Sequence, residues 1–229
     1  MLSIQELKKS FPQPGGGRIT ILKIRDFSID DAQQCVLIGD SGGGKTTLLH
    51  LIAGLTTPDC GQILVDGVDI TKLSEAGRDR YRAAKVGYVF QTFNLLAGFS
   101  ALENVRLGMS FASGKHDLQR AYQLLERVGL TDRAHYRPHQ LSVGQQQRVA
   151  IARALAAKPR LLLADEPTAN VDPASQQVVI DLIRQTCQDE GVALLLVTHS
   201  MEVAHQFKRI ENLADINLAL QTAKTTEAK

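Results

Sequence analysis

The sequence predicts an α/β protein built on a mainly parallel β-sheet. A short apolar, strand-like run at 35–38 leads into a glycine-rich loop, and an apolar, helix-like run follows that loop at 46–53. Further strand-like runs at 86–90, 161–164 and 193–197 are separated by stretches with helical periodicity. Strands that alternate with helices are typical of a parallel sheet covered by helices.

The N-terminal third is richer in strand-like runs. Residues 18–24 partly alternate between apolar and polar side chains, and residues 61–65 run into an Asp-Gly pair at 66–67, which is a turn signal. The glycine-rich stretch at 12–17 lacks a flanking strand and helix, so we expect a flexible turn there and no phosphate-binding role.

Helices are expected to predominate from about residue 92 to residue 157. Apolar residues recur at helical spacing between Leu118 and Val128, and Gly129 ends that helix. A later helix opens at Asp172, followed by proline at the first helical position, and runs to about residue 189.

These observations predict one domain over residues 1–229, a length sufficient for a single α/β core. Segments 1–90 and 158–220 would form the sheet-containing body, and about 92–157 the helical subdomain. The polar tail at 221–229 is expected to fray.

Composition argues against several classes of protein. The net charge is only +2 and no block of like charges occurs, so no nucleic-acid partner is expected. This charge balance does not exclude binding to a membrane surface or to an acidic partner. Apolar runs such as 193–197 are far shorter than the ~20 residues that span a bilayer, and the N-terminus lacks a signal segment. We therefore expect a cytosolic chain whose three cysteines are reduced.

The loop after the strand at 35–38 fits the phosphate-binding pattern G-x-x-x-x-G-K-[ST] in the strand–loop–helix context that the pattern requires. Its glycines allow backbone N–H groups to turn around phosphate oxygens, Lys45 adds a positive charge, and Thr46 would place a hydroxyl on Mg²⁺. A glycine-rich turn with an incidental lysine is the competing interpretation, and the flanking elements disfavour it. The nucleotide-binding residues predicted here are Gly39, Asp40, Ser41, Gly42, Gly43, Gly44, Lys45, Thr46 and Thr47.

An acidic pair, Asp165 and Glu166, follows the strand-like run at 161–164. A carboxylate delivered to the strand end beside a phosphate loop can hold the water shell of Mg²⁺, which is the role we expect for Asp165. Glu166 could accept a proton from an attacking water. Without the phosphate loop, the same pair would be only a polar strand end.

Ser142 is placed as the N-cap of a helix that runs to about residue 157. Its hydroxyl and the free N–H groups of the first turn can form an anion site. Taken alone, this pattern indicates no more than the start of a helix.

Taken together, these segments resemble the ATP-binding subunits of ABC transporters. The resemblance covers nearly the whole chain and implies a phosphate-loop NTPase core with an N-terminal antiparallel β subdomain and a helical insertion subdomain. The family's motifs occur in the family's order: the phosphate loop, Gln91 after the strand at 86–90, a signature at 141–145, Asp165-Glu166, Asp172 and His199.

The resemblance also implies roles for individual residues. Gln91 would contact Mg²⁺ and the attacking water and relay to a membrane partner, so that Thr46, Gln91 and Asp165 form the metal set and Lys45, Gln91, Glu166 and His199 the catalytic set. His199 would contact the γ-phosphate, although a strand-end histidine that caps the backbone is the simpler alternative. Phe11 would stack on adenine, or else be an ordinary core or surface phenylalanine. Ser142, Gly144 and Gln145 of the signature would bind ATP held by a second copy, and Asp172 would lie across the subunit boundary.

Two positions and one segment depart from the family pattern. Val143 stands where glycine is usual in the signature, and Asp40 brings a negative charge near the phosphate loop. The segment at 209–215 replaces the Asp-Gly hairpin that often ends the family's domain, which makes the C-terminal strands less certain to form.

The function implied is hydrolysis of ATP with Mg²⁺ by a homodimer that sandwiches ATP and drives a separate membrane permease. The permease would dock near 91–96, which places the chain peripherally on the cytoplasmic face of the inner membrane. Segments 89–96 and 101–105 resemble the lipoprotein-release and macrolide-export branch, an exporter or force-transmitting complex with a periplasmic adaptor as a further component. The alternatives are regulation of cell-wall or cell-division enzymes through a membrane partner, a soluble ATPase of DNA repair or translation, and nucleotide binding without hydrolysis.

Overall fold

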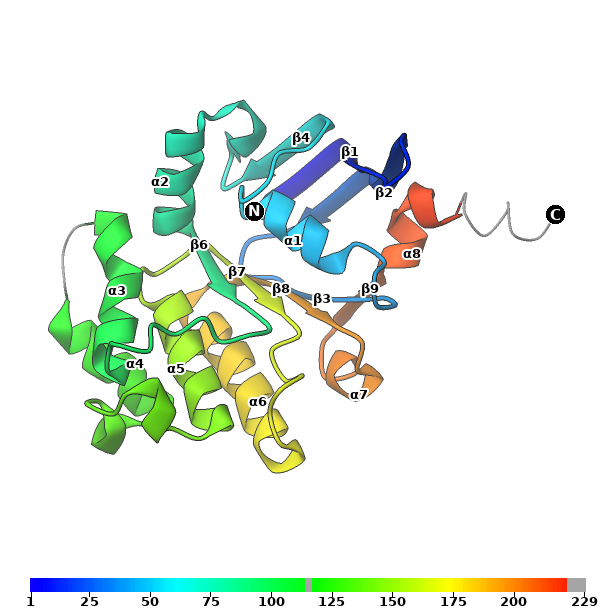
Figure 1. Ribbon diagram of the computed structural model, residues 1–229. Coiled ribbons are helices and arrows are strands. Elements are labelled where there is room, and N and C mark those ends of the chain that lie inside the picture. The colour runs from blue at the N-terminus through cyan, green and yellow to red at the C-terminus, as the bar shows by residue number, and fades with distance from the viewer. Residues whose placement is uncertain (114–116, 222–229) are drawn as a thin grey trace.

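The computed structural model describes residues 1–113 and 117–221. At its centre is a five-stranded sheet in the order β6-β7-β8-β3-β9 (Figure 1), and every neighbouring pair of its strands is parallel. The strands are β3 (Gln34–Ile38), β6 (Val86–Val89), β7 (Leu161–Asp165), β8 (Ala193–Thr198) and β9 (Arg209–Asn212). The predicted parallel sheet is thus confirmed.

A second sheet packs above the first, and its strands are antiparallel, in the order β2-β1-β4-β5. It consists of β1 (Leu2–Pro12), β2 (Arg18–Ile29), β4 (Cys60–Val65) and β5 (Val68–Asp69). The glycine-rich stretch at 12–17 forms the tight connection between β1 and β2, with positive φ angles at Gly15, Gly16 and Gly17. This sheet is the antiparallel subdomain that the family resemblance implied.

Helices cover both faces of the parallel sheet (Figure 1). Helix α1 lies between the two sheets, whereas α3, α4, α5 and α6 gather on the opposite face. The α-helices are α1 (Lys45–Ile52), α2 (Glu75–Lys85), α3 (Ala101–Ser113), α4 (Leu118–Arg127), α5 (Val143–Leu155), α6 (Pro173–Glu190), α7 (Met201–Ala204) and α8 (Leu213–Ile216). Three short 3₁₀ helices occupy Ile70–Lys72, Thr131–Arg133 and Pro138–Gln140.

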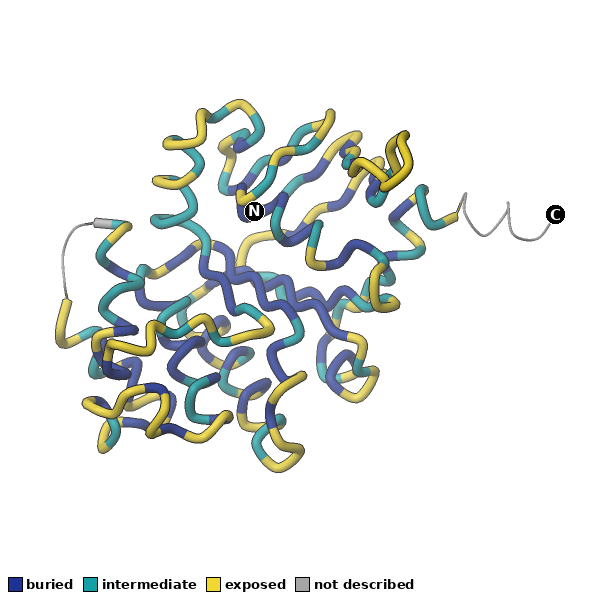
Figure 2. The backbone as a smooth tube through the Cα atoms, in the orientation of Figure 1, coloured by how far each residue is buried: buried dark blue, intermediate teal, exposed yellow. Residues whose placement is uncertain are grey.

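The parallel sheet separates two hydrophobic cores, and its inner strands β7, β8 and β3 are buried on both faces (Figure 2). Along β7, Leu162 packs with α3 to α6, while Leu161 and Leu163 pack with α1 and the antiparallel sheet. Successive strand residues point to opposite faces, so a strand buried on both sides must be apolar throughout. This explains the uninterrupted apolar runs. Parallel pairing also places the carboxyl ends of β7, β8 and β3 side by side.

Helix α2 was not expected from the sequence. None of its residues is buried, so the apolar stripe that reveals most helices is missing. A capping signal was present, since the Ser74 hydroxyl accepts a hydrogen bond from the backbone N–H of Gly77. The Tyr81 hydroxyl donates to the carbonyl of Val65 and fastens α2 to the antiparallel sheet.

The chain after His199 forms α7, β9 and α8 in place of a hairpin. Strand β9 pairs in parallel with β3, which shows that a strand does form in the segment where the family's hairpin is missing. Of the predicted frayed tail, residues 222–229 lie outside the described residues. Among the helices of the described chain, none combines the length and apolar character needed to cross a membrane.

Candidate functional site

The phosphate-loop sequence connects β3 to α1, as predicted. Gly42 and Gly44 have φ angles of 80° and 101°, a region that residues with a side chain rarely adopt. Gly44 is the N-cap of α1, and a Cβ atom there would lie 3.0 Å from side-chain carbons of both Ile21 and Leu22. Backbone conformation and lack of space therefore both require glycine at this position.

Lys45 is the first residue of α1, and only 8% of its surface is exposed. Its ammonium donates hydrogen bonds to the carbonyls of Gly39 (2.7 Å) and Asp40 (3.0 Å). It also lies 4.0 Å from the Glu166 carboxylate. The loop thus folds around a buried positive charge that faces an acidic strand end.

The acidic pair lies at the carboxyl end of β7. Asp165 is buried, and this burial raises the pKa of its carboxyl; the nearby Glu166 adds to the rise, while a hydrogen bond from Thr46 and the charges of His50 and Lys45 oppose it. Glu166 has a φ angle of 45°, and its backbone N–H donates to the carbonyl of Val197 (2.9 Å). Left-handed backbone at a non-glycine residue stores strain of a kind found at functional sites.

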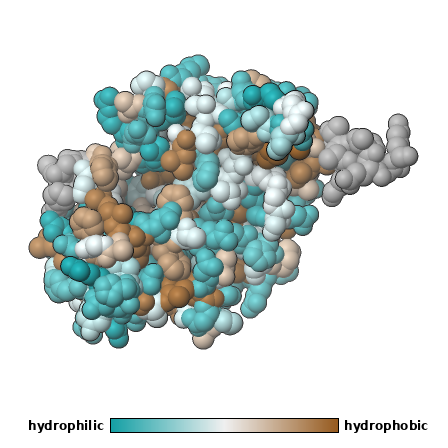
Figure 3. Space-filling model, in the orientation of Figure 1, coloured by the Kyte–Doolittle hydropathy of each residue, from teal (hydrophilic) through white to brown (hydrophobic). Residues whose placement is uncertain are grey.

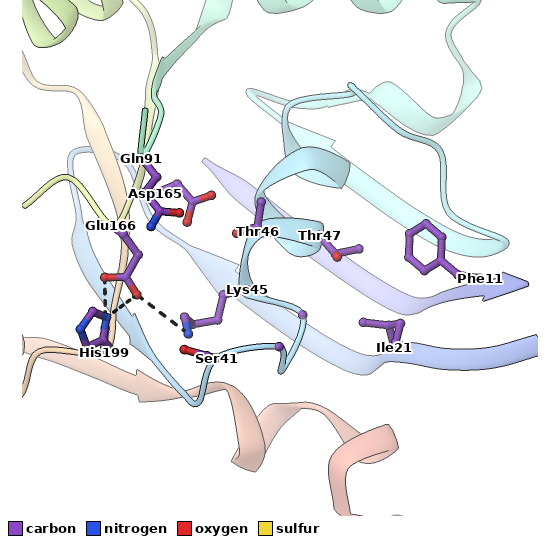
Figure 4. A pocket seen from close by; sticks show the side chains of 12 residues that line it. Phe11, Ile21, Ser41, Lys45, Thr46, Thr47, Gln91, Asp165, Glu166 and His199 are labelled. Atoms are coloured by element: carbon purple, nitrogen blue, oxygen red, sulfur yellow. Dashed lines mark hydrogen bonds and ion pairs between the residues drawn. The ribbon is translucent and has the colours of Figure 1, made fainter. Parts of the chain in front are cut away.

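His199 directly follows β8 and turns its ring toward Glu166 (Figure 4). The distance from Nδ1 to Glu166 Oε1 is 2.9 Å, and the backbone N–H of His199 also donates to Glu166 Oε2 (3.4 Å). The His199 side chain is otherwise 66% exposed. Glu166 therefore sits between His199 on one side and Lys45 on the other.

These groups line a cavity of about 460 Å³. Phe11, at the end of β1, lies at the far end of the cavity from His199, next to Ile21 (Figure 4). The cavity brings together eleven predicted positions: Phe11, Ser41, Gly42, Gly44, Lys45, Thr46, Thr47, Gln91, Asp165, Glu166 and His199. Ile21 also lines the cavity but was not predicted. The alternation of apolar and polar residues along β2 does not show which side chain contacts the phosphate loop.

The remaining predicted positions do not line this cavity. Gly39, Asp40 and Gly43 belong to the phosphate loop but are not among the residues that line the cavity. Ser142, Gly144, Gln145 and Asp172 form a separate group at the adjoining N-termini of α5 and α6.

In this second group, Ser142 caps α5 as predicted. Its Oγ accepts from the N–H of Gln145 (3.3 Å), and the Gln145 side chain accepts from the N–H of Ser142 (2.9 Å). A Cβ atom on Gly144 would lie 3.3 Å from Ser175 and 3.8 Å from Asp172 Oδ2. A hydrogen bond from Ser175 lowers the pKa of Asp172, the N-cap of α6.

The loop after β6 connects the cavity to the helical region. Gln91 lines the cavity, and its carbonyl accepts from the Asn170 side chain (2.9 Å). Arg153 of α5 donates to the carbonyls of Phe93 (2.8 Å) and Asn94 (2.5 Å). Asn170 and Arg153 were not predicted, since these long-range contacts have no local sequence signal.

A phosphate loop, an acidic strand end and a histidine at the carboxyl edge of a parallel sheet define a phosphate-loop nucleoside triphosphatase. A profile described as ABC transporter matches residues 22–169. The chain belongs to this family, as one of its ATP-binding proteins, and it is an ATPase.

Curated relatives extend the match to nearly the full chain. It is 43% identical to the lipoprotein-releasing system ATP-binding protein LolD 2 of Caulobacter vibrioides, over 96% of this chain and 97% of that one. It is 42% identical to LolD of Idiomarina loihiensis, over 93% of this chain and 94% of that one. A macrolide export ATP-binding/permease protein, MacB of Rhodopirellula baltica, is 40% identical over 94% of this chain, which covers 32% of that longer protein.

Solved structures support the same assignment. The fold matches the ATP-binding cassette MJ0796 in a dimeric, post-hydrolysis state bound to ADP and Pi, with a TM-score of 0.84 and 34% identity. That match covers 93% of this chain and 94% of the other. The predicted ABC-type ATPase fold is therefore confirmed.

Proposed function

We propose that this chain is the ATP-hydrolysing subunit that powers a separate membrane permease, in an exporter or force-transmitting complex of the lipoprotein-release and macrolide-export type. One observation carries the hydrolytic part of this proposal. Lys45, Glu166 and His199 form a continuous chain of contacts in a cavity of about 460 Å³, a size typical of small-molecule sites.

The residues would divide the chemistry as follows. The loop from Ser41 to Thr47 would bind the phosphates with its N–H groups and with Lys45, while Phe11 would stack on the adenine at the far end. Glu166 would take the proton of the attacking water, and its hydrogen bond to His199 orients the carboxylate for that step. Lys45 and His199 would stabilise the negative charge of the transferring phosphoryl group.

A magnesium site fits the residues at the end of β7. The Asp165 carboxylate is buried beside the Thr46 hydroxyl, and its raised pKa reflects a charge that the chain itself compensates only in part. We propose that Thr46, Asp165 and Gln91 hold Mg²⁺ and its water shell. When bound, this ion would neutralise charge on the β- and γ-phosphates.

We further propose that two copies of the chain close around ATP. Ser142, Gly144, Gln145 and Asp172 do not line the cavity of their own chain, yet the α5 N-terminus is suited to an anion. This group would complete the site of a second copy. The related cassette MJ0796 forms a dimer in two solved structures that this chain matches. Within one domain, residues 1–90 and 158–220 would carry the nucleotide, and 92–157 would carry the signature.

A hydrophobic groove next to the loop after β6 supports a permease contact. It encloses about 320 Å³ between α2, β6, α3 and α5, and its lining includes Leu55, Phe90, Asn94 and Phe111. Phe111 is 73% exposed, and hydrophobic side chains gather over α3 and the neighbouring loop (Figure 3). A cytoplasmic helix of the permease would dock here, near 91–96, and hold the chain on the cytoplasmic face of the inner membrane.

The branch assignment rests on the LolD relatives, which match over nearly their full length. If the chain belongs to this branch, we propose a periplasmic adaptor as a further component of the complex. Regulation of cell-wall or cell-division enzymes is the alternative, and no contact among the described residues favours it.

Reconstitution tests this proposal. The chain and the permease encoded beside it are co-expressed, and ATPase activity and release of membrane-embedded cargo are measured in proteoliposomes. We expect co-purification and cargo release that needs ATP. Leu96→Asp should abolish co-purification, whereas Leu118→Asp, at a similarly exposed leucine of α4, should not. If both variants co-purified with the permease equally well, the permease would not dock at Leu96.

A further inference from the structure

The segment from Leu213 to Gln221 contacts the phosphate loop and the backbone of Ile21, a residue that lines the nucleotide cavity; we call this segment the C-terminal strap. It begins with α8, directly after β9, and its position is fixed by Asn217. The N–H of Asn217 donates to the carbonyl of Leu213 (2.9 Å), and the N–H of Leu220 donates to the carbonyl of Asn217 (3.0 Å).

Asn217 ties the strap to β2. Its side chain is 0% exposed; Oδ1 accepts from the N–H of Lys23 (2.9 Å), and Nδ2 donates to the carbonyl of Ile21 (2.9 Å). Oδ1 also accepts from the N–H of Ala219 within the strap (3.2 Å). Because β2 is an edge strand of its sheet, these bonds satisfy backbone groups that no neighbouring strand reaches.

Ile21 is the point at which this contact reaches the cavity. Its side chain lines the nucleotide cavity and lies 3.0 Å from the position that a Cβ of Gly44 would take. A shift in the backbone of Ile21 would therefore displace both a wall of the cavity and the start of α1. Asn217 holds that backbone through a buried hydrogen bond.

The strap also packs against the phosphate loop. The Cβ of Leu213 lies 3.2 Å from the position that a Cβ of Gly39 would take. Leu213 and Leu220 each place a methyl carbon 3.8 Å from the corresponding position of Gly43. One buried residue, Asn217, thus fixes a segment that touches the loop at Gly39 and Gly43 and is hydrogen-bonded to the backbone of Ile21.

We propose that Asn217 is a positioning residue for nucleotide binding, which holds the phosphate loop and Ile21 in the geometry that accepts ATP. The inference rests on the nucleotide site proposed above. Pre-organised sites bind more tightly because they lose less conformational freedom on binding. Releasing the strap should therefore weaken affinity for ATP while the groups that carry out hydrolysis stay in place.

The test compares Asn217→Ala with Asn104→Ala in the purified full chain. Asn104 is also 0% exposed and also holds backbone groups, at Leu96, Phe99 and Ser100, but it lies in the helical region, away from the cavity. Thermal unfolding, the Kd for ATP without Mg²⁺ by calorimetry, and kcat and KM with Mg²⁺ are measured. We expect both variants to unfold at lower temperature. Asn217→Ala alone should raise Kd and KM about tenfold, with kcat within about twofold.

Leu220→Ala is the second variant, because it keeps the Asn217 bonds and removes only packing against the loop. We expect a smaller rise in Kd and KM, with kcat again within about twofold. If Asn217→Ala does not fold, Leu220→Ala alone tests the positioning role. Equal Kd values for the Asn217, Leu220 and Asn104 variants would overturn the positioning role. If Lys45→Ala bound ATP as tightly as the unaltered chain, the nucleotide site itself would be wrong, and the inference would fall with it.

Discussion

Glu166 and His199 share a hydrogen bond of 2.9 Å between Oε1 and Nδ1, and the same carboxylate oxygen lies 4.0 Å from the Lys45 ammonium. A carboxylate held between a histidine ring and a lysine is placed to accept a proton from a water molecule in the cavity. Three segments that are distant in sequence supply these groups, and the order of strands β7, β8 and β3 brings them together.

The first prediction concerns Glu166→Gln. The amide cannot accept a proton, so the rate of phosphate release should fall by about 100-fold or more, as is typical when a general base is lost. Binding of ATP should persist because Lys45 and the loop are unchanged. Phosphate release and ATP binding are measured side by side with Glu202→Gln, a change at an exposed glutamate of α7. Phosphate release from Glu166→Gln at the unaltered rate would show that another group is the base.

The second prediction concerns Gly44→Ala, with Gly15→Ala as its control. Both glycines have φ near 100°, but only Gly44 has atoms close to the position of an added Cβ. Left-handed strain alone costs about 1–3 kcal/mol. Urea denaturation should show a larger loss of unfolding free energy for Gly44→Ala, and calorimetry should show lost ATP binding for this variant only. Equal losses in the two variants would mean that Ile21 and Leu22 do not press on the loop.

The third prediction concerns the pH dependence of stability through Asp165. Its pKa is raised by burial, so the folded chain holds this proton more firmly than the unfolded chain does. Ionisation of Asp165 therefore costs stability as the pH rises above the ordinary carboxyl value. Without nucleotide, Asp165→Asn should raise the melting temperature at neutral pH, and the gain should shrink in acid.

Asp69 provides the opposite case. Burial alone would raise the pKa of Asp69, but hydrogen bonds from Thr71, Lys72 and Gln62 outweigh it and lower the pKa to about 2. A carboxylate with a lowered pKa stabilises the folded state above its ordinary pKa and loses that contribution as the pH falls. Asp69→Asn should therefore lower the melting temperature at neutral pH. Shifts of the same sign in the Asp165 and Asp69 variants would contradict the argument.

The sequence predicted those parts of the site that are encoded by local patterns. The loop from Gly39 to Thr46 is recognisable because strand, glycines and helix follow one another, and Asp165-Glu166 because an apolar strand ends in two acids. The resemblance added His199 and Gln91. Ile21 and Asn217 were missed, because a residue that acts through a contact nearly two hundred positions away has no local signature. Helix α2 was missed because it buries no side chain.

The mass of the Glu166→Gln protein in solution with ATP shows whether two copies share each nucleotide. Light scattering should show a dimer that needs ATP. Adding Ser142→Ala removes a cap worth about 0.5–2 kcal/mol, and with it the hydroxyl offered to the partner's nucleotide. We expect this double variant to stay monomeric while each chain still binds ATP.

Ser74→Ala in the same Glu166→Gln background is the matched control, because Ser74 caps α2 in the same way as Ser142 caps α5. This control should still dimerise with ATP. If the Ser142→Ala variant dimerised as readily as the Ser74→Ala variant, the signature would not complete the site of a second copy, and the shared-site account would be wrong.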